Sequence, residues 1–212
     1  GLIGSNGAGK STTFKSILGL IRKDSGMITL FGKDVDSLTR QEKEHIGVVL
    51  SDSGFSTYLT LTDIAAVLEA MYTNVKKTEF LKACDHYQLP VNKKIKDFST
   101  GMKAKVKILA AISHKPSFLL LDEPMAGFDP VFRRDFLGMI QDILDKDIGI
   151  LLSTHITEDL DKLADYVLVL KNGKLVQNDT REVLEDKYRS AARKRKAPDS
   201  SFERFHIRDL LS

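Results

Sequence analysis

Short runs of apolar residues alternate along the chain with longer segments in which apolar residues recur every three or four positions. An unbroken apolar run bounded by turn residues is typical of a buried strand, and the wider spacing is typical of a helix packed on a core. Strands are predicted over residues 1–3, 27–31, 46–50, 118–122 and 148–152, and a β-hairpin over 166–170 and 174–177. Helices are predicted over residues 10–18, 39–44, 60–72, 77–87, 98–115, 129–145, 156–163 and 180–188. This alternation predicts an α/β fold built on a parallel sheet.

Two departures from simple alternation bear on domain organisation. The stretch between Gly54 and Lys115 carries predicted helices and no predicted strand, so we expect a helical subdomain at about residues 55–115 inserted into the α/β core. The sequence also starts without Met, inside the strand that feeds the loop after Ile3. Since that strand should lie centrally in a parallel sheet, we expect the chain to lack the first strands of its domain.

The clearest chemistry lies in residues 4–12, which contain the phosphate-binding pattern G-x-x-x-x-G-K-[ST] between a predicted strand and a predicted helix. Glycines let a backbone approach a ligand closely, and loop N–H groups at a helix N-terminus favour an anion. Lys10 would reach the β- and γ-phosphates, and the Ser11 hydroxyl would bind Mg²⁺. The alternative, a glycine-rich turn with a solvated lysine, does not explain the strand and helix around it. The predicted nucleotide-binding residues are Gly4, Ser5, Asn6, Gly7, Ala8, Gly9, Lys10, Ser11 and Thr12.

Two carboxylates end a strongly apolar strand, and a histidine ends the next one. Asp122 is predicted to hold Mg²⁺, and Glu123 to act as the general base toward an attacking water. The alternative for this pair is a solvated acidic turn. A lone histidine such as His155 is more often hydrogen-bonded than catalytic. Because the tips of parallel strands meet at one edge of the sheet, we nevertheless expect His155 near the carboxylates.

Composition restricts the class of protein without identifying it. The 212 residues are 42% hydrophobic and 29% charged, which fits one soluble domain with an inserted subdomain. The single cysteine, Cys84, excludes an internal disulfide or a cysteine-based metal cluster and fits a reducing cytosol. A net charge of +3 is too small to argue for nucleic acid, so no nucleic-acid partner is expected. Residues 186–212 form a predicted tail with a basic cluster at 189–196, which is more often solvated than functional.

Five motifs in order resemble those of the ATP-binding cassette family. They are residues 4–12, 98–102 (Phe-Ser-Thr-Gly-Met), 119–124 (Leu-Leu-Leu-Asp-Glu-Pro), 126–130 (Ala-Gly-Phe-Asp-Pro) and 153–155 (Ser-Thr-His). The resemblance covers residues 1 to about 185, which we expect to be the ATPase domain. It implies ATP and Mg²⁺ as cofactors, with His155 as the histidine that senses the γ-phosphate.

The resemblance also implies roles for residues outside the phosphate loop. Ser99 and Gly101 match the signature motif, which meets the nucleotide bound by a second subunit, while Thr100 and Met102 depart from the family's usual Gly and Gln. Phe128 stands where Leu is usual in the loop that links the two sites.

The clearest departure is Ser51, where the family usually has a Gln that binds the metal. Ser51 or Asp52 could offer the metal an oxygen on a shorter arm. The aromatic residue that stacks on adenine in the family would precede the phosphate loop, so its segment is missing from this sequence.

The function that the resemblance implies is that of the ATPase subunit of an exporter-like transporter. We expect a homodimer or paired cassette around two ATP molecules, an integral membrane permease subunit as partner, and a peripheral location on the cytoplasmic face of the cell membrane. One alternative is a soluble cassette ATPase acting on ribosomes or DNA. Another is a degenerate cassette that binds ATP without turnover, which Ser51 favours and the intact Glu123 and His155 oppose.

Overall fold

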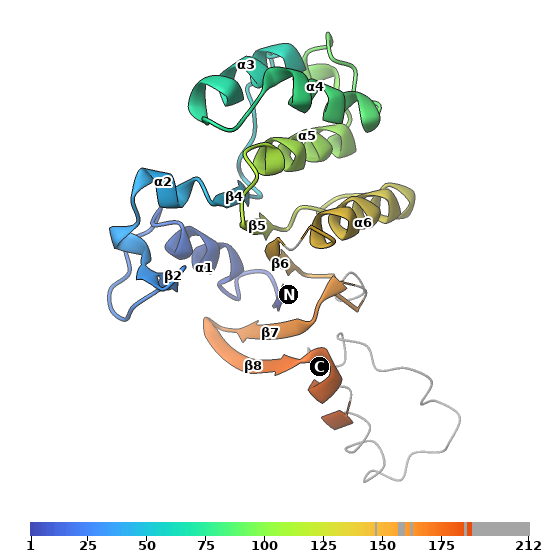
Figure 1. Ribbon diagram of the computed structural model, residues 1–212. Helices are drawn as coiled ribbons and strands as arrows, with labels where there is room; N and C mark the ends of the chain where they lie inside the picture. The colour runs from blue at the N-terminus through green and yellow to red at the C-terminus, as the bar shows by residue number, and fades with distance from the viewer. Residues whose placement is uncertain (147, 157–159, 162, 185, 188–212) are drawn as a thin grey trace, which may run out of the picture.

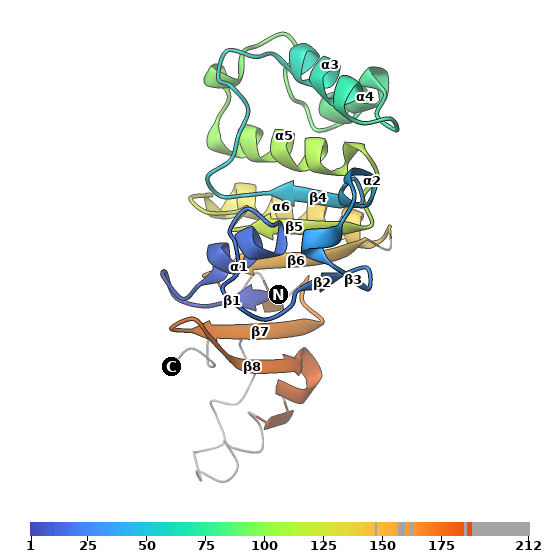
Figure 2. The same ribbon diagram turned by 90° about the vertical axis from the view of Figure 1, so that its left-hand side faces the viewer.

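The computed structural model describes the whole chain except residues 147, 157–159, 162, 185 and 188–212. Within the described part, one six-stranded sheet runs through the molecule in the order β4-β5-β6-β1-β7-β8 (Figures 1 and 2). All neighbouring strands are parallel except β7 and β8, which form an antiparallel hairpin. The strands span Leu2–Ile3 (β1), Ile46–Val49 (β4), Phe118–Asp122 (β5), Gly149–Thr154 (β6), Tyr166–Lys171 (β7) and Lys174–Thr180 (β8). The predicted α/β class with a parallel core is confirmed.

The short strand β1 lies in the middle of the sheet, as its sequence predicts. Leu2 and Ile3 pair with Ser153 and Thr154 of β6 on one side, and with Leu168 and Val169 of β7 on the other. Both β1 side chains are almost fully buried. The loop that follows β1 therefore starts from a fixed point at the sheet edge where β5 and β6 also end.

Helices cover both faces of the sheet. Strand β5 shows why, because Leu120 contacts the cluster around Phe14 of α1 (Lys10–Ile17), whereas Leu119 and Leu121 belong to the cluster that contains Phe136 of α6 (Pro130–Leu144). Successive side chains of a strand point to opposite faces, so an unbroken apolar run supplies both layers. Each buried leucine contributes about 1.5–3 kcal/mol relative to an exposed one.

Three helices stack outward from one side of the sheet, at the top of Figure 1: α3 (Leu61–Met71), α4 (Lys77–His86) and α5 (Thr100–Ser113). Helix α3 begins at a capping box, in which the Thr60 hydroxyl and the Asp63 carboxylate each accept a backbone N–H of the other residue. The buried face of α3 carries Ile64 and Leu68, which share a core with Phe80 of α4. The predicted limits of a helical subdomain, about 55–115, remain a prediction.

The segment after α1 differs from its predicted form. Instead of one strand and a turn at 32–34, a two-stranded hairpin joins β2 (Thr29–Leu30) to β3 (Lys33–Asp34). The turn lies at Phe31 and Gly32, which have φ of 53° and 76°. Positive φ at both central residues matches the twist of the flanking strands, so the pairing can continue directly after a two-residue turn. A short helix α2 (Arg40–Lys43) then leads into β4.

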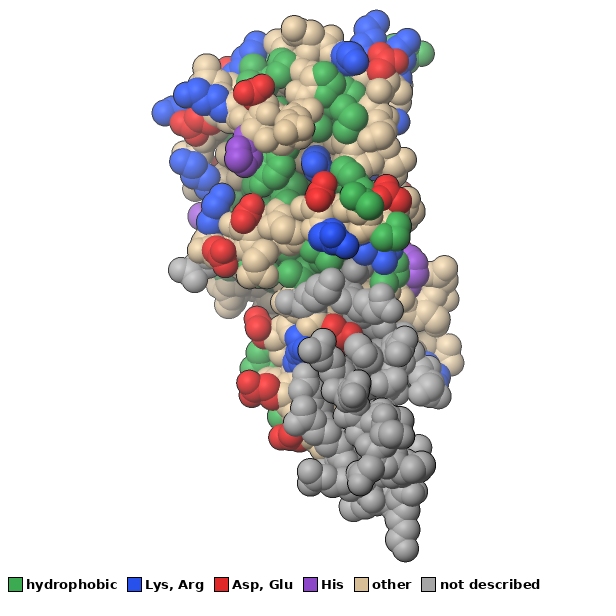
Figure 3. Space-filling view, turned by 90° about the vertical axis from the view of Figure 1, so that its right-hand side faces the viewer, with side chains coloured by type: hydrophobic (Ala, Val, Ile, Leu, Met, Phe, Trp, Pro, Cys, Tyr) green, Lys and Arg blue, Asp and Glu red, His purple; other side chains and the backbone are tan. Residues whose placement is uncertain are grey.

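Some predictions lie outside the described residues, wholly or in part. These are the helix over 156–163, the helix over 180–188, and nearly all of the basic tail 186–212. No helix in the described ranges combines the length and apolar character that crossing a membrane requires. On the face in Figure 3, Lys and Arg side chains lie among acidic and hydrophobic ones. In the described part of this face, charges of both signs are therefore interspersed.

Candidate active site

The phosphate-loop motif follows β1 and leads into α1. Gly9 is the N-cap of α1 at φ 108°, a conformation that side chains rarely allow. Gly4 is required for a different reason, since a Cβ there would lie 2.6 Å from the carbonyl oxygen of Leu170 and 2.8 Å from the Cβ of Ala8. The loop is thus folded closely against β7 and back on itself at Ala8. Backbone N–H groups at the start of α1 remain available for an anion.

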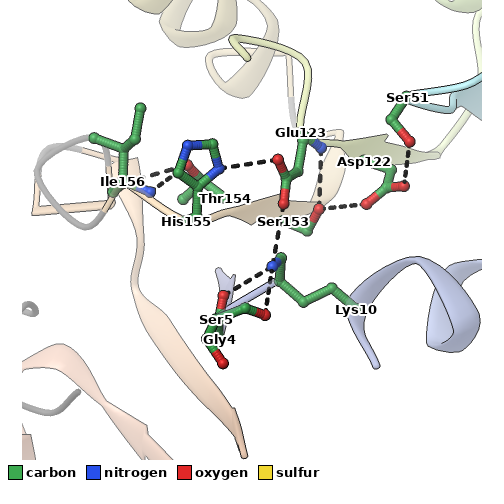
Figure 4. A network of polar contacts seen from close by, with 10 residues as sticks. All are labelled: Gly4, Ser5, Lys10, Ser51, Asp122, Glu123, Ser153, Thr154, His155 and Ile156. Carbon is green, nitrogen blue, oxygen red and sulfur yellow. Dashed lines mark hydrogen bonds and ion pairs between the residues drawn. The ribbon is translucent and has the colours of Figure 1, made fainter. Parts of the chain in front are cut away.

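Lys10 turns its ammonium group back over this loop. Its Nζ donates to the carbonyl oxygens of Gly4 at 2.8 Å and Ser5 at 3.2 Å, and lies 3.1 Å from Oε1 of Glu123 (Figure 4). Only 5% of the side chain is exposed. A buried charge needs partners of this kind, and the three acceptors supply them. The loop after β1 is thereby linked to the end of β5.

Asp122 ends β5 in a fully buried position where both carboxylate oxygens are hydrogen-bonded. Ser153 Oγ donates to Oδ1 at 2.6 Å, and Ser51 Oγ donates to Oδ2 at 3.1 Å. These two hydroxyl donors give a carboxylate without access to water the hydrogen-bond partners that burial requires. Asp122 and Ser51, which the sequence assigns to one metal, are therefore in direct contact.

Glu123 follows with a left-handed backbone, φ 47°, and a side chain that spans two motifs. Its Oε1 faces Lys10, and its Oε2 lies 2.9 Å from Nδ1 of His155. The Glu123 side chain is 18% exposed and that of His155 is 43% exposed, so water can reach this pair. The predicted base and the predicted γ-phosphate sensor thus form one hydrogen-bonded unit at the sheet edge (Figure 4).

Other predicted site residues lie apart from this network. Asp52 is exposed and pairs with Lys15 of α1 at 2.7 Å, and this hydrogen bond lowers the pKa of the Asp52 carboxyl. In the described part of the chain, no hydrogen bond joins Asp52 or Ser11 to Asp122. Thr12 is exposed on the first turn of α1.

The two signature residues stand at the start of α5. The Ser99 side chain caps that helix by accepting the backbone N–H of Met102. Gly101 is buried where a Cβ would clash with the ring of Phe132, so it allows α5 to approach α6. Their expected contact with a nucleotide held by a second subunit remains a prediction.

The oxygen donors at the end of β5 fit a magnesium ion. Mg²⁺ prefers hard oxygen ligands and usually takes one or two carboxylates together with substrate phosphates and water. Asp122 and Ser51 supply a carboxylate and a hydroxyl, and Ser11 a second hydroxyl at the start of α1. No group of three or more His, Cys, Asp or Glu among the described residues could hold a metal alone. Phosphate oxygens and water are the further ligands that Mg²⁺ usually takes at such a site.

The network contains one buried residue, Ser153, that lies in the Ser-Thr-His motif but to which the motifs assign no role. Its sequence signal is a hydroxyl two positions before His155, in a strand adjacent to the one that ends in Asp122. That signal can be interpreted only once the pairing of β5 with β6 is known.

Comparisons with known proteins agree with this geometry. A sequence model of the family described as "ABC transporter" matches residues 1–126. The bacitracin transport ATP-binding protein BcrA of Bacillus licheniformis is 33% identical over 181 residues, which cover 84% of this chain and 59% of that protein. The linearmycin resistance ATP-binding protein LnrL of Bacillus subtilis is 32% identical over 181 residues, 83% of this chain and 58% of that protein.

The fold has a similar solved counterpart. A structure described as the ATP binding subunit of an ABC transporter superposes with a TM-score of 0.76 at 29% identity, covering 92% of this chain and 82% of that chain. The chain spans less than two thirds of the length of both curated relatives.

Proposed function

The chain belongs to the ABC transporter family, and we propose that it binds and hydrolyses ATP to power a separate membrane subunit. One observation carries this proposal: the two oxygens of Glu123 face Lys10 of the phosphate loop and His155 after β6. Phosphoryl transfer to water needs a phosphate cradle, a metal ion and a group that orients the attacking water. Residues at this one edge of the sheet offer a candidate for each role.

In this proposal, residues 4–12 hold the triphosphate and Lys10 faces its β- and γ-phosphates. Asp122, Ser51 and Ser11 hold Mg²⁺, which when bound offsets the negative charge that develops on the phosphates. Asp52 could join them only after leaving Lys15. The signature residues Ser99 and Gly101 meet the nucleotide of a second cassette.

Glu123 acts as the general base that takes a proton from the attacking water. Its Oε1 lies 3.1 Å from the Lys10 ammonium, so phosphates that attract Lys10 would free this oxygen for water. His155 holds the other oxygen at 2.9 Å and so fixes the direction in which the carboxylate points. The contacts with Lys10 and His155 thus hold the Glu123 carboxylate in a defined position.

We further propose that two cassettes close around two ATP molecules and open after hydrolysis, and that this movement is transmitted to an integral membrane subunit. The partner would dock near residues 51–72, where Tyr58, Val67 and Met71 expose large apolar side chains. Such surfaces are common at protein–protein contacts. The names of the two relatives, which refer to bacitracin transport and linearmycin resistance, support a transporter. The chain would then lie peripherally on the cytoplasmic face of the membrane.

A second candidate is a cassette that binds ATP without turnover, and the observation that favours it is Ser51. Its hydroxyl reaches Asp122, yet it is a shorter arm than the Gln that the family usually has. A soluble cassette acting on ribosomes or DNA has no such support in the described residues.

Glu123→Gln separates turnover from binding. The amide keeps the size of the side chain but cannot accept the proton, so phosphate release should fall by about 10²–10⁴-fold while ATP binding persists. The matched control is Glu79→Gln, because Glu79 is an exposed residue that pairs with Lys76 on α4. Both variants are compared with the wild type by phosphate release and by titration with a labelled ATP analogue. Wild-type turnover in Glu123→Gln would contradict the role of the base, and ATP binding without turnover in the wild type would favour the second candidate.

A further inference from the structure

Ser153 lies in β6 directly opposite Asp122 of β5, in the parallel register of the two strands. Its side chain is fully buried, with 0% exposure. The hydroxyl therefore has no access to bulk water, and its hydrogen bonds must be made within the protein. Both of the bonds that it makes go to the two residues at the end of β5.

The first bond fixes the metal-binding carboxylate. Ser153 Oγ donates to Oδ1 of Asp122 at 2.6 Å, a distance at the short end of the range for a hydroxyl hydrogen bond. With Oδ1 held on the β6 side, Oδ2 points to Ser51, whose hydroxyl lies 3.1 Å away. Ser153 thus selects which of the two oxygens is directed to the place assigned to Mg²⁺.

The second bond fixes the backbone of the base. The N–H of Glu123 donates to Ser153 Oγ at 3.0 Å and to the carbonyl oxygen of Ser153 at 3.2 Å. Glu123 has φ 47°, which residues with a side chain rarely adopt unless the surroundings impose it. This conformation turns the side chain toward Lys10 and His155 (Figure 4).

We propose that Ser153 is a positioning residue that holds the metal carboxylate and the general base as one unit. One hydroxyl donates to the side chain of Asp122 and accepts the backbone N–H of Glu123, so it sets the geometry of both residues relative to each other. The inference rests on the proposed function. It predicts that losing this hydroxyl weakens the contribution of the metal to nucleotide binding and slows turnover.

The test compares nucleotide affinity with and without metal. A fluorescent, non-hydrolysable ATP analogue is titrated in EDTA and again in Mn²⁺, and phosphate release from ATP is measured as a function of Mg²⁺. In Ser153→Ala the affinity in EDTA should match the wild type, whereas the gain from Mn²⁺ should shrink about tenfold, as expected for a lost hydrogen bond to a charged group. The Mg²⁺ concentration for half-maximal turnover should rise. A residue that only stabilises the fold would lower the melting temperature without changing the gain from metal.

Two further variants complete the design. Ser153→Thr keeps the hydroxyl and should keep the wild-type gain from Mn²⁺, even where its extra methyl lowers the melting temperature. Ser113→Ala is the control, because Ser113 donates only to the carbonyl oxygen of Ala110 within α5, and it should leave all readouts unchanged. If Ser153→Ala does not fold, Ser153→Cys takes its place, because a thiol fills the same space but hydrogen-bonds weakly.

The outcomes separate this inference from the function on which it rests. If the wild type gains affinity from Mn²⁺ and the alanine or cysteine variant gains as much with unchanged turnover, the role of Ser153 is overturned and the proposed function stands. A wild type that binds no nucleotide contradicts the proposed function and the inference together.

Discussion

His114, which follows α5, shows how burial alters the chemistry of a single residue. Its ring is only 6% exposed and stacks on Tyr72, with ring centroids 4.3 Å apart. Its Nε2 lies 3.4 Å from the carbonyl oxygen of Ile46. Removal from water disfavours the charged imidazolium and lowers the pKa of His114 below 6.5, against the opposing effects of the Ile46 carbonyl and, after it, of nearby Glu44. The fold therefore disfavours the charged form of this histidine.

A dependence of stability on pH follows from this lowered pKa. Below about pH 6.5 the unfolded chain binds a proton at this site that the folded chain does not, so stability should fall as the pH falls toward the folded-state pKa. One proton gives a slope of at most about 1.4 kcal/mol per pH unit. Urea unfolding from pH 8 to pH 5 should show a shallower slope for His114→Phe, which keeps the stacking on Tyr72. Identical slopes in the two proteins would mean that His114 does not make this contribution.

For single residues, the sequence predicts which side chains suit the reaction better than it predicts which other residues they contact. Motif spacing selects Lys10, Asp122 and Glu123, because each has a chemical type that phosphoryl transfer requires. It includes Ser153 in the Ser-Thr-His motif but gives it no role, since the role of a serine in a strand depends on its neighbour across the sheet. Asp52 has a chemical type that suits a metal ligand and follows the candidate ligand Ser51. Its carboxylate nevertheless pairs with Lys15.

At the scale of elements, β4 and α5 approach each other closely at Gly47. A Cβ at this buried strand position would press on the carbonyl oxygen of Ala111 in α5 and lie 2.7 Å from Cδ1 of Leu119. A backbone carbonyl cannot move aside as a flexible side chain can. The absence of a side chain at Gly47 therefore sets the distance between the helix and the sheet.

Two glycine substitutions test this packing. Gly47→Ala should destabilise the fold by about 1–3 kcal/mol through overpacking. Gly138→Ala is the matched control, because Gly138 is an exposed position inside α6 with open space around it, and alanine there should stabilise by about 0.5–1 kcal/mol. Thermal melting of both variants gives the comparison. Equal melting temperatures for Gly47→Ala and the wild type would show that β4 and α5 can separate at no cost.

Most helices and strands can be predicted from the local sequence, because residues typical of helix starts and turns mark their ends. Thr60 and Asp63 mark the start of α3, and Asp129 with Pro130 marks the start of α6. The sequence does not predict strand β3. The strand has only two residues, Lys33 and Asp34, and both are polar, so neither periodicity nor apolar character identifies it. Their pairing depends on the backbone of the turn at Phe31 and Gly32.

At the scale of the whole molecule, the candidate site is assembled from segments far apart in the chain. The loop after β1, the loop after β4 and the ends of β5 and β6 meet at one edge because these strands run parallel in one sheet. Sequence order predicts that these segments belong to one sheet. It does not give the strand order or the register, which arise from packing of the whole core and decide that Ser153 faces Asp122.

We expect this edge of the sheet to bind MgATP through the phosphate loop, and a nucleotide titration of Lys10→Ala checks that expectation. Charged hydrogen bonds contribute about 1.5–3 kcal/mol each, so losing the ammonium should weaken binding of a labelled ATP analogue at least tenfold. Lys23→Ala serves as the control, because Lys23 is an ion-paired lysine whose partners, Asp34 and Asp36, lie outside the site. We predict wild-type affinity for Lys23→Ala and a large loss for Lys10→Ala with an unchanged fold by circular dichroism. Equal affinity in all three proteins would contradict the assignment of this loop as the nucleotide site.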